Sequence, residues 1–509
     1  MSTPHPLPDP GPGAPTPPIA LGGDPGSVTA HFDARHVDVP DPVVERLRSA
    51  CAEVTTDPAE RAEASRDWWP LAMQWAADGQ VAGLAGVVAR PARADEVAAV
   101  LAVCDEARVP VTAAAGRSGV CGASVPLYGG VVLDMTGLAG IRDVDGTSLV
   151  LDVAPGTFGD HLETALRTEH GVTLGHWPQS VALSTVGGWL ACRSAGQLSG
   201  RYGKIEDMVL GLDVALADGR IVHTGGAPRS AVGPDLNQLF VGSEGTLGVI
   251  TGARLRLHPA PVAERSGAWL VDGFVAGLEV LRRIVQRGAT PAVLRLYDPA
   301  ESQRTYHTED GQALVLVLDE GDPTMVDATM AVVADEMAAV GATDAPAGHV
   351  EHWLERRNDV AALEALISRG YTVDTMEVAG PWATLPAIYE ATVAALLGVE
   401  GTIAASAHQS HSYPSGGCLY FTFAGQVDAD RRDAYYRDLW DAGQRAVLAH
   451  GGALSHHHGV GVNRGRFMTE ALGEAFQVLV AAKQALDPHG ILNPGKLGLP
   501  SPFGVTAPW

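Results

Sequence analysis

Three consecutive histidines in the segment SHHHGVG at 455–461 are the clearest chemical signal in the chain. Imidazole has a reference pKa of about 6.5, so such a cluster can accept or pass on a proton near neutral pH. On a strand or an extended loop, His456 and His458 would share one face and His457 would face the other way. The segment predicts a proton-transfer site. A turn that brings histidines together without a chemical role is the alternative.

A second polar cluster, AHQSHSYPSGG at 407–417, contains His408, His411 and Tyr413 just ahead of an apolar strand. A phenol has a reference pKa of ~10, so Tyr413 could act as a base near neutral pH only beside imidazole groups. Together with the histidines of 455–461, His408 or His411 could instead hold a metal ion. No carboxylate lies at an obvious ligand spacing, so we predict acid–base chemistry and no metal.

Arg295 is a single charge inside VLRLYD at 293–298, an apolar run typical of a strand. A guanidinium can bind a carboxylate or a phosphate through two parallel hydrogen bonds, so an arginine in such a place is commonly an anion anchor. A structural ion pair is the alternative. With the histidines and the tyrosine, Arg295 predicts a site for a small anionic molecule.

The chain also contains three loops rich in small residues: TAAAGRSGVCG at 112–122, PQSVALSTVGGWLACRSAG at 178–196 and GSEGTLGVIT at 242–251. Glycine has no Cβ, so such loops let the backbone approach a large flat ligand closely. One such loop alone is usually an ordinary turn, but three in succession indicate a long cofactor threaded through the domain. No GxGxxG motif opens a βαβ unit, so a Rossmann nucleotide site is not supported.

In this order the loops resemble the flavin domain of the vanillyl-alcohol oxidase/p-cresol methylhydroxylase family, from about residue 80 to 260. The resemblance implies FAD, with backbone N–H groups of 112–118 around its pyrophosphate. Where relatives link flavin to a His or Cys, this chain has Arg117, Ser118 and Gly187, so non-covalent binding is expected. The residues expected to bind FAD are Ala114, Ala115, Gly116, Arg117, Ser118, Gly119, Pro178, Ser180, Ser184, Thr185, Gly187, Gly188, Ser194, Ala195, Tyr202, Glu244, Gly245, Thr246, Gly248, Val249, Ile250 and Asn493.

Further motifs, GRYGKIEDMV at 200–209 among them, narrow the resemblance to the alkyldihydroxyacetonephosphate synthases and their bacterial homologues. Those enzymes exchange the acyl group of a dihydroxyacetone phosphate ester for a fatty alcohol, through a substrate adduct on flavin N5. Their tyrosine acts as acid or base, their histidines are needed for activity, and an arginine serves the substrate phosphate. The catalytic residues implied here, with His411 added as a candidate, are Tyr413, His456, His457, His458 and Arg295.

A second active-site arginine of that family is absent from the matching position, which falls at or near Leu363 counting back from Trp382. Arg356, Arg357 and Arg369 align with it only if a gap is introduced. The loss of one substrate arginine indicates the same flavin chemistry on a different substrate. We expect an FAD-dependent oxidoreductase that oxidises a hydroxyl-bearing, anionic substrate such as a 2-hydroxy acid by hydride transfer to flavin N5. The alternatives are an alkylglycerone-phosphate synthase-like transferase and a non-catalytic flavin-binding protein.

The resemblance implies an α+β fold: a two-subdomain PCMH-type FAD-binding domain plus an α/β cap of the FAD-linked oxidase C-terminal type. Apolar periodicity predicts a hairpin turning at Asp218-Gly219, strands at 313–321 and 416–425, and helices at 94–107, 322–340, 428–450 and 467–486. The expected order is a disordered Pro-rich tail (1–27), a helical arm (28–80), the FAD domain (81–260), the cap (261–485) and a C-terminal segment (486–509) that returns to the FAD domain.

Composition limits the partners of this 509-residue chain. Its formal net charge of −24 would repel nucleic acid and anionic membranes. We find no apolar run of about 18 residues and no signal peptide. Five cysteines without a CxxC motif favour reduced thiols. We therefore expect a cytoplasmic protein that acts on a small molecule, as a homodimer, with no membrane span.

Overall fold

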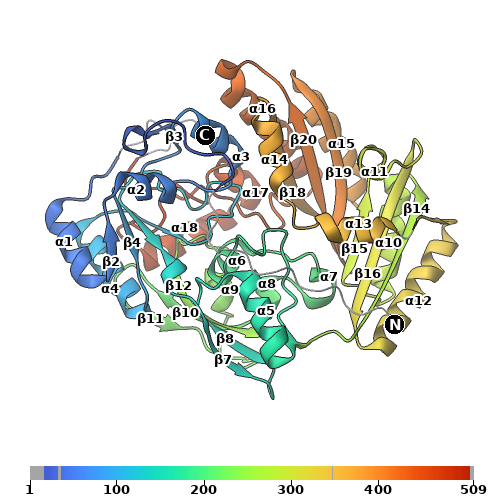
Figure 1. Cartoon of the computed structure of the whole chain (residues 1–509), viewed down its shortest axis with the longest axis horizontal. Helices are drawn as coiled ribbons and strands as arrows, with labels where there is room; N and C mark the ends of the chain where they lie inside the picture. The colour runs from blue at the N-terminus through green and yellow to red at the C-terminus, as the bar shows by residue number, and fades with distance from the viewer. Residues whose placement is uncertain (1–16, 33–35, 347, 505–509) are drawn as a thin grey trace.

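The computed structural model describes residues 17–32, 36–346 and 348–504, which form three main sheets with helices packed around them (Figure 1). Residues 1–16 of the Pro-rich tail and 505–509 of the C-terminal segment lie outside these ranges. For 17–27 the prediction of disorder was wrong. Ile19 is buried with Met73 and Val373, and its carbonyl accepts a hydrogen bond from Arg66 at 2.5 Å. The apolar side chain finds a partner surface that a Pro-rich composition does not reveal.

The N-terminal arm mixes helices with short strands: α1 (Asp41–Ala50), α2 (Pro58–Ala64), α3 (Pro70–Ala77), β1 (Thr29–Ala30), β2 (Glu53–Thr55) and β3 (Gln80–Val81). Strand β2 joins the first main sheet, of order β2-β4-β6-β5. Its other strands are parallel: β4 (Val87–Arg90), β6 (Val131–Asp134) and β5 (Val111–Ala114). Helix α4 (Ala94–Ala107), with the predicted bounds, links β4 to β5. Because β5 ends at Ala114, the sheet leads directly into the first small-residue loop.

The second sheet is antiparallel, of order β11-β10-β12-β8-β7. Its strands are β7 (Ile141–Asp145), β8 (Val150–Val153), β10 (Val209–Ala215), β11 (Ile221–His223) and β12 (Val249–Arg256). Strands β10 and β11 form the predicted hairpin, with Gly219 at a φ of +83° in its turn. Around the sheet lie α5 (Gly159–His170), α6 (Val186–Cys192), α7 (Ser199–Tyr202), α8 (Ile205–Met208), α9 (Asn237–Phe240) and the pair β9 (Val172–Thr173) and β13 (His258–Pro259).

The third sheet belongs to the cap and has the order β17-β14-β16-β15-β19-β20-β18. Its strands are β14 (Ala263–Asp272), β15 (Val293–Tyr297), β16 (Gln312–Gly321), β17 (Thr343–Asp344), β18 (Thr372–Pro381), β19 (Thr402–Tyr413) and β20 (Gly416–Gly425). One face packs against α10 (Phe274–Gln286), α12 (Pro323–Ala339), α15 (Leu385–Leu397) and α16 (Arg432–Ala449). The helices predicted at 322–340 and 428–450 are thus confirmed. The other face lies toward the FAD-binding part, with α11 (Pro299–Tyr306), α13 (Gly348–Arg356) and α14 (Ala361–Ile367).

Alternation along β20 assigns its side chains to the two faces of the cap sheet. Phe421 and Phe423 are fully buried beneath the helices. Tyr420 and Thr422 point the other way and line a cavity. The strand therefore connects the hydrophobic core of the cap to the candidate site.

The last two helices, α17 (Met468–Leu472) and α18 (Ala475–Leu486), lie among the N-terminal elements (red among blue and green in Figure 1). The single helix predicted for 467–486 was wrong, because Gly473 adopts a φ of +53° and separates the two. Lys483 of α18 donates hydrogen bonds to the carbonyls of Thr246 and Leu492, at 2.8 and 2.7 Å. No helix in the described part of the chain combines the length and the apolarity that a membrane span requires.

Candidate active site

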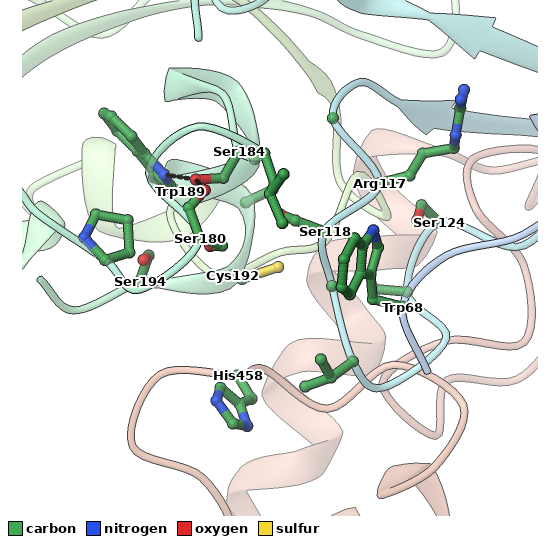
Figure 2. A pocket seen from close by; sticks show the side chains of 18 of the residues that line it. Trp68, Arg117, Ser118, Ser124, Ser180, Ser184, Trp189, Cys192, Ser194 and His458 are labelled. Carbon is green, nitrogen blue, oxygen red and sulfur yellow. Dashed lines mark hydrogen bonds between the residues drawn. The ribbon is translucent and has the colours of Figure 1, made fainter. Parts of the chain in front are cut away.

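A cavity of about 490 Å³ lies where the two FAD-domain sheets, the cap and the C-terminal part of the chain meet. Figure 2 shows Ser184 and Cys192 on one side of it, Trp68 and Ser118 on another, and His458 reaching it from a later loop. All three small-residue loops contribute to its wall. The expected cofactor residues found there are Ala114, Ala115, Gly116, Arg117, Ser118, Gly119, Pro178, Ser180, Ser184, Thr185, Gly187, Gly188, Ser194, Ala195, Glu244, Gly245, Gly248, Val249 and Ile250.

The glycines of these loops suit a close-fitting ligand. A Cβ added to Gly188 would have its nearest neighbour at 3.5 Å, and one on Gly245 at 3.7 Å, so each would make only ordinary van der Waals contact with the protein. Gly116 has another role, because its Cβ would lie 2.1 Å from the carbonyl oxygen of Leu183. It lets two loops touch. The Nε atom of Arg117, in the loop expected at the pyrophosphate, is buried without a hydrogen-bond partner in the described residues. Such an unused donor suits an anionic cofactor.

Three expected cofactor residues do not line this cavity. The hydroxyl of Tyr202 donates to Glu320 at 2.7 Å, and that of Thr246 donates to a carbonyl of its own loop at 2.7 Å. The amide of Asn493 donates to the carbonyls of two lining residues, Ala123 and Glu244, at 2.8 and 2.6 Å. These side chains make hydrogen bonds outside the cavity instead of contacting its interior. A motif in the sequence does not distinguish a supporting residue from a lining one.

The cavity also has lining residues outside the three small-residue loops, which the sequence did not predict: Trp68, Asp374, Thr375, Tyr420 and Thr422 among them. For Tyr420 a signal was available. The alternation of Leu419, Phe421 and Phe423 with Tyr420 and Thr422 places the latter two on the face of the strand away from its helices. The hydroxyl of Tyr420 donates to Thr375 at 3.0 Å, which fixes its ring at the cavity wall.

The three histidines lie on an irregular loop wrapped around Glu377 of β18. One carboxylate oxygen of Glu377 accepts hydrogen bonds from the backbone N–H groups of His456, His457 and His458, at 3.2, 2.9 and 2.6 Å. Burial alone would raise the pKa of Glu377, but its ion pair with Arg464 lowers it to about 2. The carboxylate therefore stays charged and holds the loop by its main chain.

The expected alternation of the histidine side chains was wrong, because the loop is curved. His457 and His458 both line the cavity, whereas His456 points to Tyr413. The Tyr413 hydroxyl lies 2.8 Å from Nε2 of His456, and Nδ1 of His456 lies 2.9 Å from Nδ1 of His457. Burial holds the pKa of both imidazoles well below the usual value, so both are neutral. A neutral imidazole has one donor and one acceptor nitrogen, so the three side chains form a directed chain of hydrogen bonds.

Four potential metal ligands lie in this cluster, with their atoms within 4.8 Å of one another: His411, Cys418, His456 and His457. In His411 both nitrogens are already used, since Nε2 donates to the Gly196 carbonyl at 3.0 Å and Nδ1 lies 2.8 Å from the Ser410 hydroxyl. Burial lowers the pKa of His411 to about 3. We therefore interpret the cluster as a hydrogen-bonded group rather than a metal centre.

A second cavity, of about 250 Å³, adjoins the first, and the two share Gln179, Ala195, Tyr420 and His457 in their walls. Arg295 of β15 lies in its wall, where Nε donates to the Tyr297 hydroxyl at 3.1 Å. No carboxylate pairs with Arg295 in the part of the chain that the structure describes. His408 and Glu301 line the same cavity and pair with each other at 3.2 Å. The structure thus brings His411, His457 and Arg295 around one chamber, with Tyr413 and His456 behind it.

Two family models match the chain: an FAD binding domain over residues 85–225 and the C-terminal domain of FAD linked oxidases over residues 260–497. An uncharacterised FAD-linked oxidoreductase of Escherichia coli strain K12, YgcU, is 31% identical over 76% of this chain and 83% of its own length. The chain belongs to the FAD-linked oxidoreductase family. It is an FAD-dependent oxidoreductase.

Two further relatives have assigned names. An alkyldihydroxyacetonephosphate synthase of Dictyostelium discoideum is 29% identical over 82% of this chain and 74% of its own. The glycolate oxidase subunit GlcD of Bacillus subtilis strain 168 is 27% identical over 84% of this chain and 92% of its own.

Two solved structures share the fold. An alkyldihydroxyacetonephosphate synthase superposes with a TM-score of 0.77 at 24% identity, over 94% of this chain and 89% of the other. p-Cresol methylhydroxylase with substrate bound superposes with a TM-score of 0.70 at 17% identity, over 92% and 99%. The expected fold, a PCMH-type FAD-binding domain with an FAD-linked oxidase cap, is confirmed.

Proposed function

We propose that this enzyme oxidises a hydroxyl-bearing anionic substrate, a 2-hydroxy acid, in the second cavity. One observation carries the proposal: Arg295, a half-buried arginine without a carboxylate partner among the described residues, lies in a chamber that adjoins the first cavity, where we place FAD, beside His457. A guanidinium that is partly withdrawn from water is stabilised by an anion, so the chamber suits a ligand with a carboxylate. The presence of a glycolate oxidase subunit among the relatives supports a hydroxy acid.

The residues of the chain divide the reaction between them. Arg295 holds the carboxylate of the substrate, which places the hydroxyl-bearing carbon at the junction of the two cavities. Nε2 of His457 makes no hydrogen bond to other described residues, so it can accept the hydroxyl proton. FAD, when bound, accepts the hydride that leaves the same carbon.

The proton does not stay on His457, because burial disfavours a charged imidazole at this position. As Nε2 gains a proton, Nδ1 of His457 passes its proton to Nδ1 of His456, Nε2 of His456 passes its proton to the Tyr413 oxygen, and the Tyr413 hydroxyl gives up its own proton to water. Tyr413 is partly exposed, so the chain of hydrogen bonds ends near solvent. In this scheme Tyr413 acts through the histidines, without touching the substrate.

The proposal is tested by adding 2-hydroxy acids and simple alcohols, one at a time, to the oxidised holoenzyme without oxygen and recording the visible spectrum. We expect a 2-hydroxy acid to bleach the oxidised flavin band, and alcohols without a carboxylate to leave it unchanged. Bleaching by alcohols alone would refute the anionic substrate. If nothing bleaches the band and only an acylated dihydroxyacetone phosphate perturbs it, the enzyme is a transferase like its synthase relatives.

A further inference from the structure

We infer that Arg357 forms a second anion site in the same chamber as Arg295, so that the substrate is a hydroxy acid with a second acidic group. The inference rests on the proposed function and deepens it, because it names the substrate class. Arg357 follows helix α13 and lies in the wall of the second cavity. In the sequence, Arg357 aligns with the missing arginine of the synthases only if a gap is introduced.

The two arginines both lie within cation–π distance of one tryptophan. The guanidinium carbon of Arg295 is 5.6 Å from the ring centre of Trp353, and that of Arg357 is 5.7 Å from the same ring. Arg357 also lies 5.0 Å from the ring centre of Trp177, which comes from the FAD domain. Aromatic faces attract a cation without neutralising it. The guanidinium of Arg357 is therefore held in place while its hydrogen-bond donors remain available to a ligand.

The main chain of the same segment is fixed to the FAD domain. Gln197 donates to the carbonyl of Arg357 at 2.8 Å, and Gln179 donates to the carbonyl of Asp359 at 2.9 Å. Trp177 donates to the side chain of Asn358 at 3.3 Å. Arg357 is thus held from both sides of the boundary between the cap and the FAD domain, as a preorganised ligand contact requires.

The chamber has more positive than negative charge. Its one carboxylate among the described lining residues, Glu301, is paired with His408 at 3.2 Å. Glu320 and Glu264 are close enough to favour the charged form of Arg357, but neither forms an ion pair with it. Burial lowers the pKa of Arg357 to about 10, so it is still a cation at neutral pH. Arg356, at the rim, adds another positive charge.

A substrate with a single acidic group could pair with only one of these two half-buried cations. A molecule with one carboxylate beside its hydroxyl and a second acidic group further along could satisfy both, with Arg295 and Arg357 each binding one anion. The second group can be a carboxylate or a phosphate, since a guanidinium binds both. The arginine that is missing near Leu363 is thus replaced by one that reaches the chamber from an earlier turn of the chain.

Binding of unreactive analogues tests the inference without any turnover. We would titrate oxidised holoenzyme with butyrate, which has one acidic group, and with glutarate and 2-phosphoglycolate, which have two, following heat by calorimetry. Wild type, Arg357→Gln and Arg357→Lys would be compared with Arg369→Gln, which removes an exposed positive charge of the cap that lines neither cavity. Comparing the affinities for glutarate and 2-phosphoglycolate shows whether the second acidic group is a carboxylate or a phosphate.

We expect wild type and Arg369→Gln to bind a two-acid analogue more tightly than butyrate. Arg357→Gln should weaken that binding about 30-fold and leave butyrate unchanged, with Arg357→Lys in between. Equal affinity of wild type for all three analogues, or an equal loss for all three in Arg357→Gln, would overturn the inference. If Arg357→Gln retains no FAD, the wild-type comparison and Arg357→Lys still decide. If two-acid analogues bind as expected but no hydroxy acid reduces the flavin, the proposed function fails and the second anion site remains.

Discussion

His457 is the only member of the histidine chain that belongs to both cavities, and this position defines its chemistry. His457 lines both cavities, and Nδ1 of its ring lies 2.9 Å from Nδ1 of His456. Because burial keeps the imidazole neutral, His457 is suited to pass a proton on rather than to keep it. Tyr413 and His456, which line neither cavity, take part only through it.

Replacing His457 by Gln should slow flavin reduction by the substrate about 10²- to 10⁴-fold, because the hydroxyl proton loses its acceptor. FAD content should not change. The measurement is the rate of flavin reduction in anaerobic stopped flow. His450→Gln, at an exposed position, serves as the matched control. Reduction of His457→Gln at the wild-type rate would show that the base lies elsewhere.

The pH dependence of the same rate gives a second check on His457. Its pKa is held well below the usual value, so the proton-accepting form persists as the pH falls through about 6.5, the reference value for histidine. The wild-type rate should therefore stay level across this range and decline only at lower pH. A midpoint near 6.5 would mean that the reacting imidazole is not His457.

At the scale of elements, strands lead into the three small-residue loops, and glycines in these loops allow close contacts. Helix α6 begins at Val186, and the Thr185 side chain caps it by accepting from the N–H of Gly188 at 3.4 Å. This cap turns the bare face of Gly188 toward the FAD site. The neighbouring Gly187 is instead needed for contact with Pro155, which a Cβ would approach to 2.8 Å. Two adjacent glycines thus serve different purposes.

Gly188→Val should therefore fold and yet bind FAD poorly, since its side chain would extend into the cofactor site and meet little protein. The ratio of flavin to protein absorbance measures FAD content, and far-ultraviolet circular dichroism measures folding. Gly146→Val, at an exposed position where a Cβ would meet nothing, is the control. A Gly188→Val protein with full FAD content would show that this face does not contact the cofactor.

The sequence was sufficient for elements with strong local signals. The periodicity of 94–107 and the Asp-Gly turn at 218–219 depend on nearby residues, so α4 and the β10–β11 hairpin could be predicted. Contacts across long distances in the chain were not accessible. Nothing near SHHHGVG reveals that a carboxylate at position 377 curves the loop. Likewise, Arg357 reaches the chamber only because Trp353 and Trp177 hold it there.

At the scale of the whole molecule, the FAD site is assembled from distant parts of the chain. Its lining runs from Trp68 in the arm to His458 near the C-terminus, and the cap contributes Tyr420. Asn493 and Lys483 connect the C-terminal segment to the loops around Glu244 and Thr246. FAD bound in this cavity would contact several units of the fold at once.

Removal of FAD should lower the midpoint temperature of thermal unfolding by several degrees, since a ligand that binds only the folded state stabilises it by mass action. Added FAD should restore the midpoint, whereas riboflavin, which has no pyrophosphate, serves as the control.

Acid precipitation should release the flavin into solution, because burial raises the pKa of Cys192 and keeps this thiol, which lines the site, protonated. A coloured precipitate would indicate a covalent link.

Glu377 fixes the backbone path of the histidine loop mainly through main-chain hydrogen bonds, which do not depend on which side chains the loop carries. One carboxylate oxygen binds three main-chain N–H groups, which every residue except proline offers, whereas of the three imidazoles that of His458 lies near the carboxylate, with Nδ1 3.4 Å from Oε2. A relative could exchange one of the three side chains and retain the geometry around it. A single acidic residue, Glu377, can therefore preserve the backbone of this loop while the proton-transferring side chains on it change during evolution.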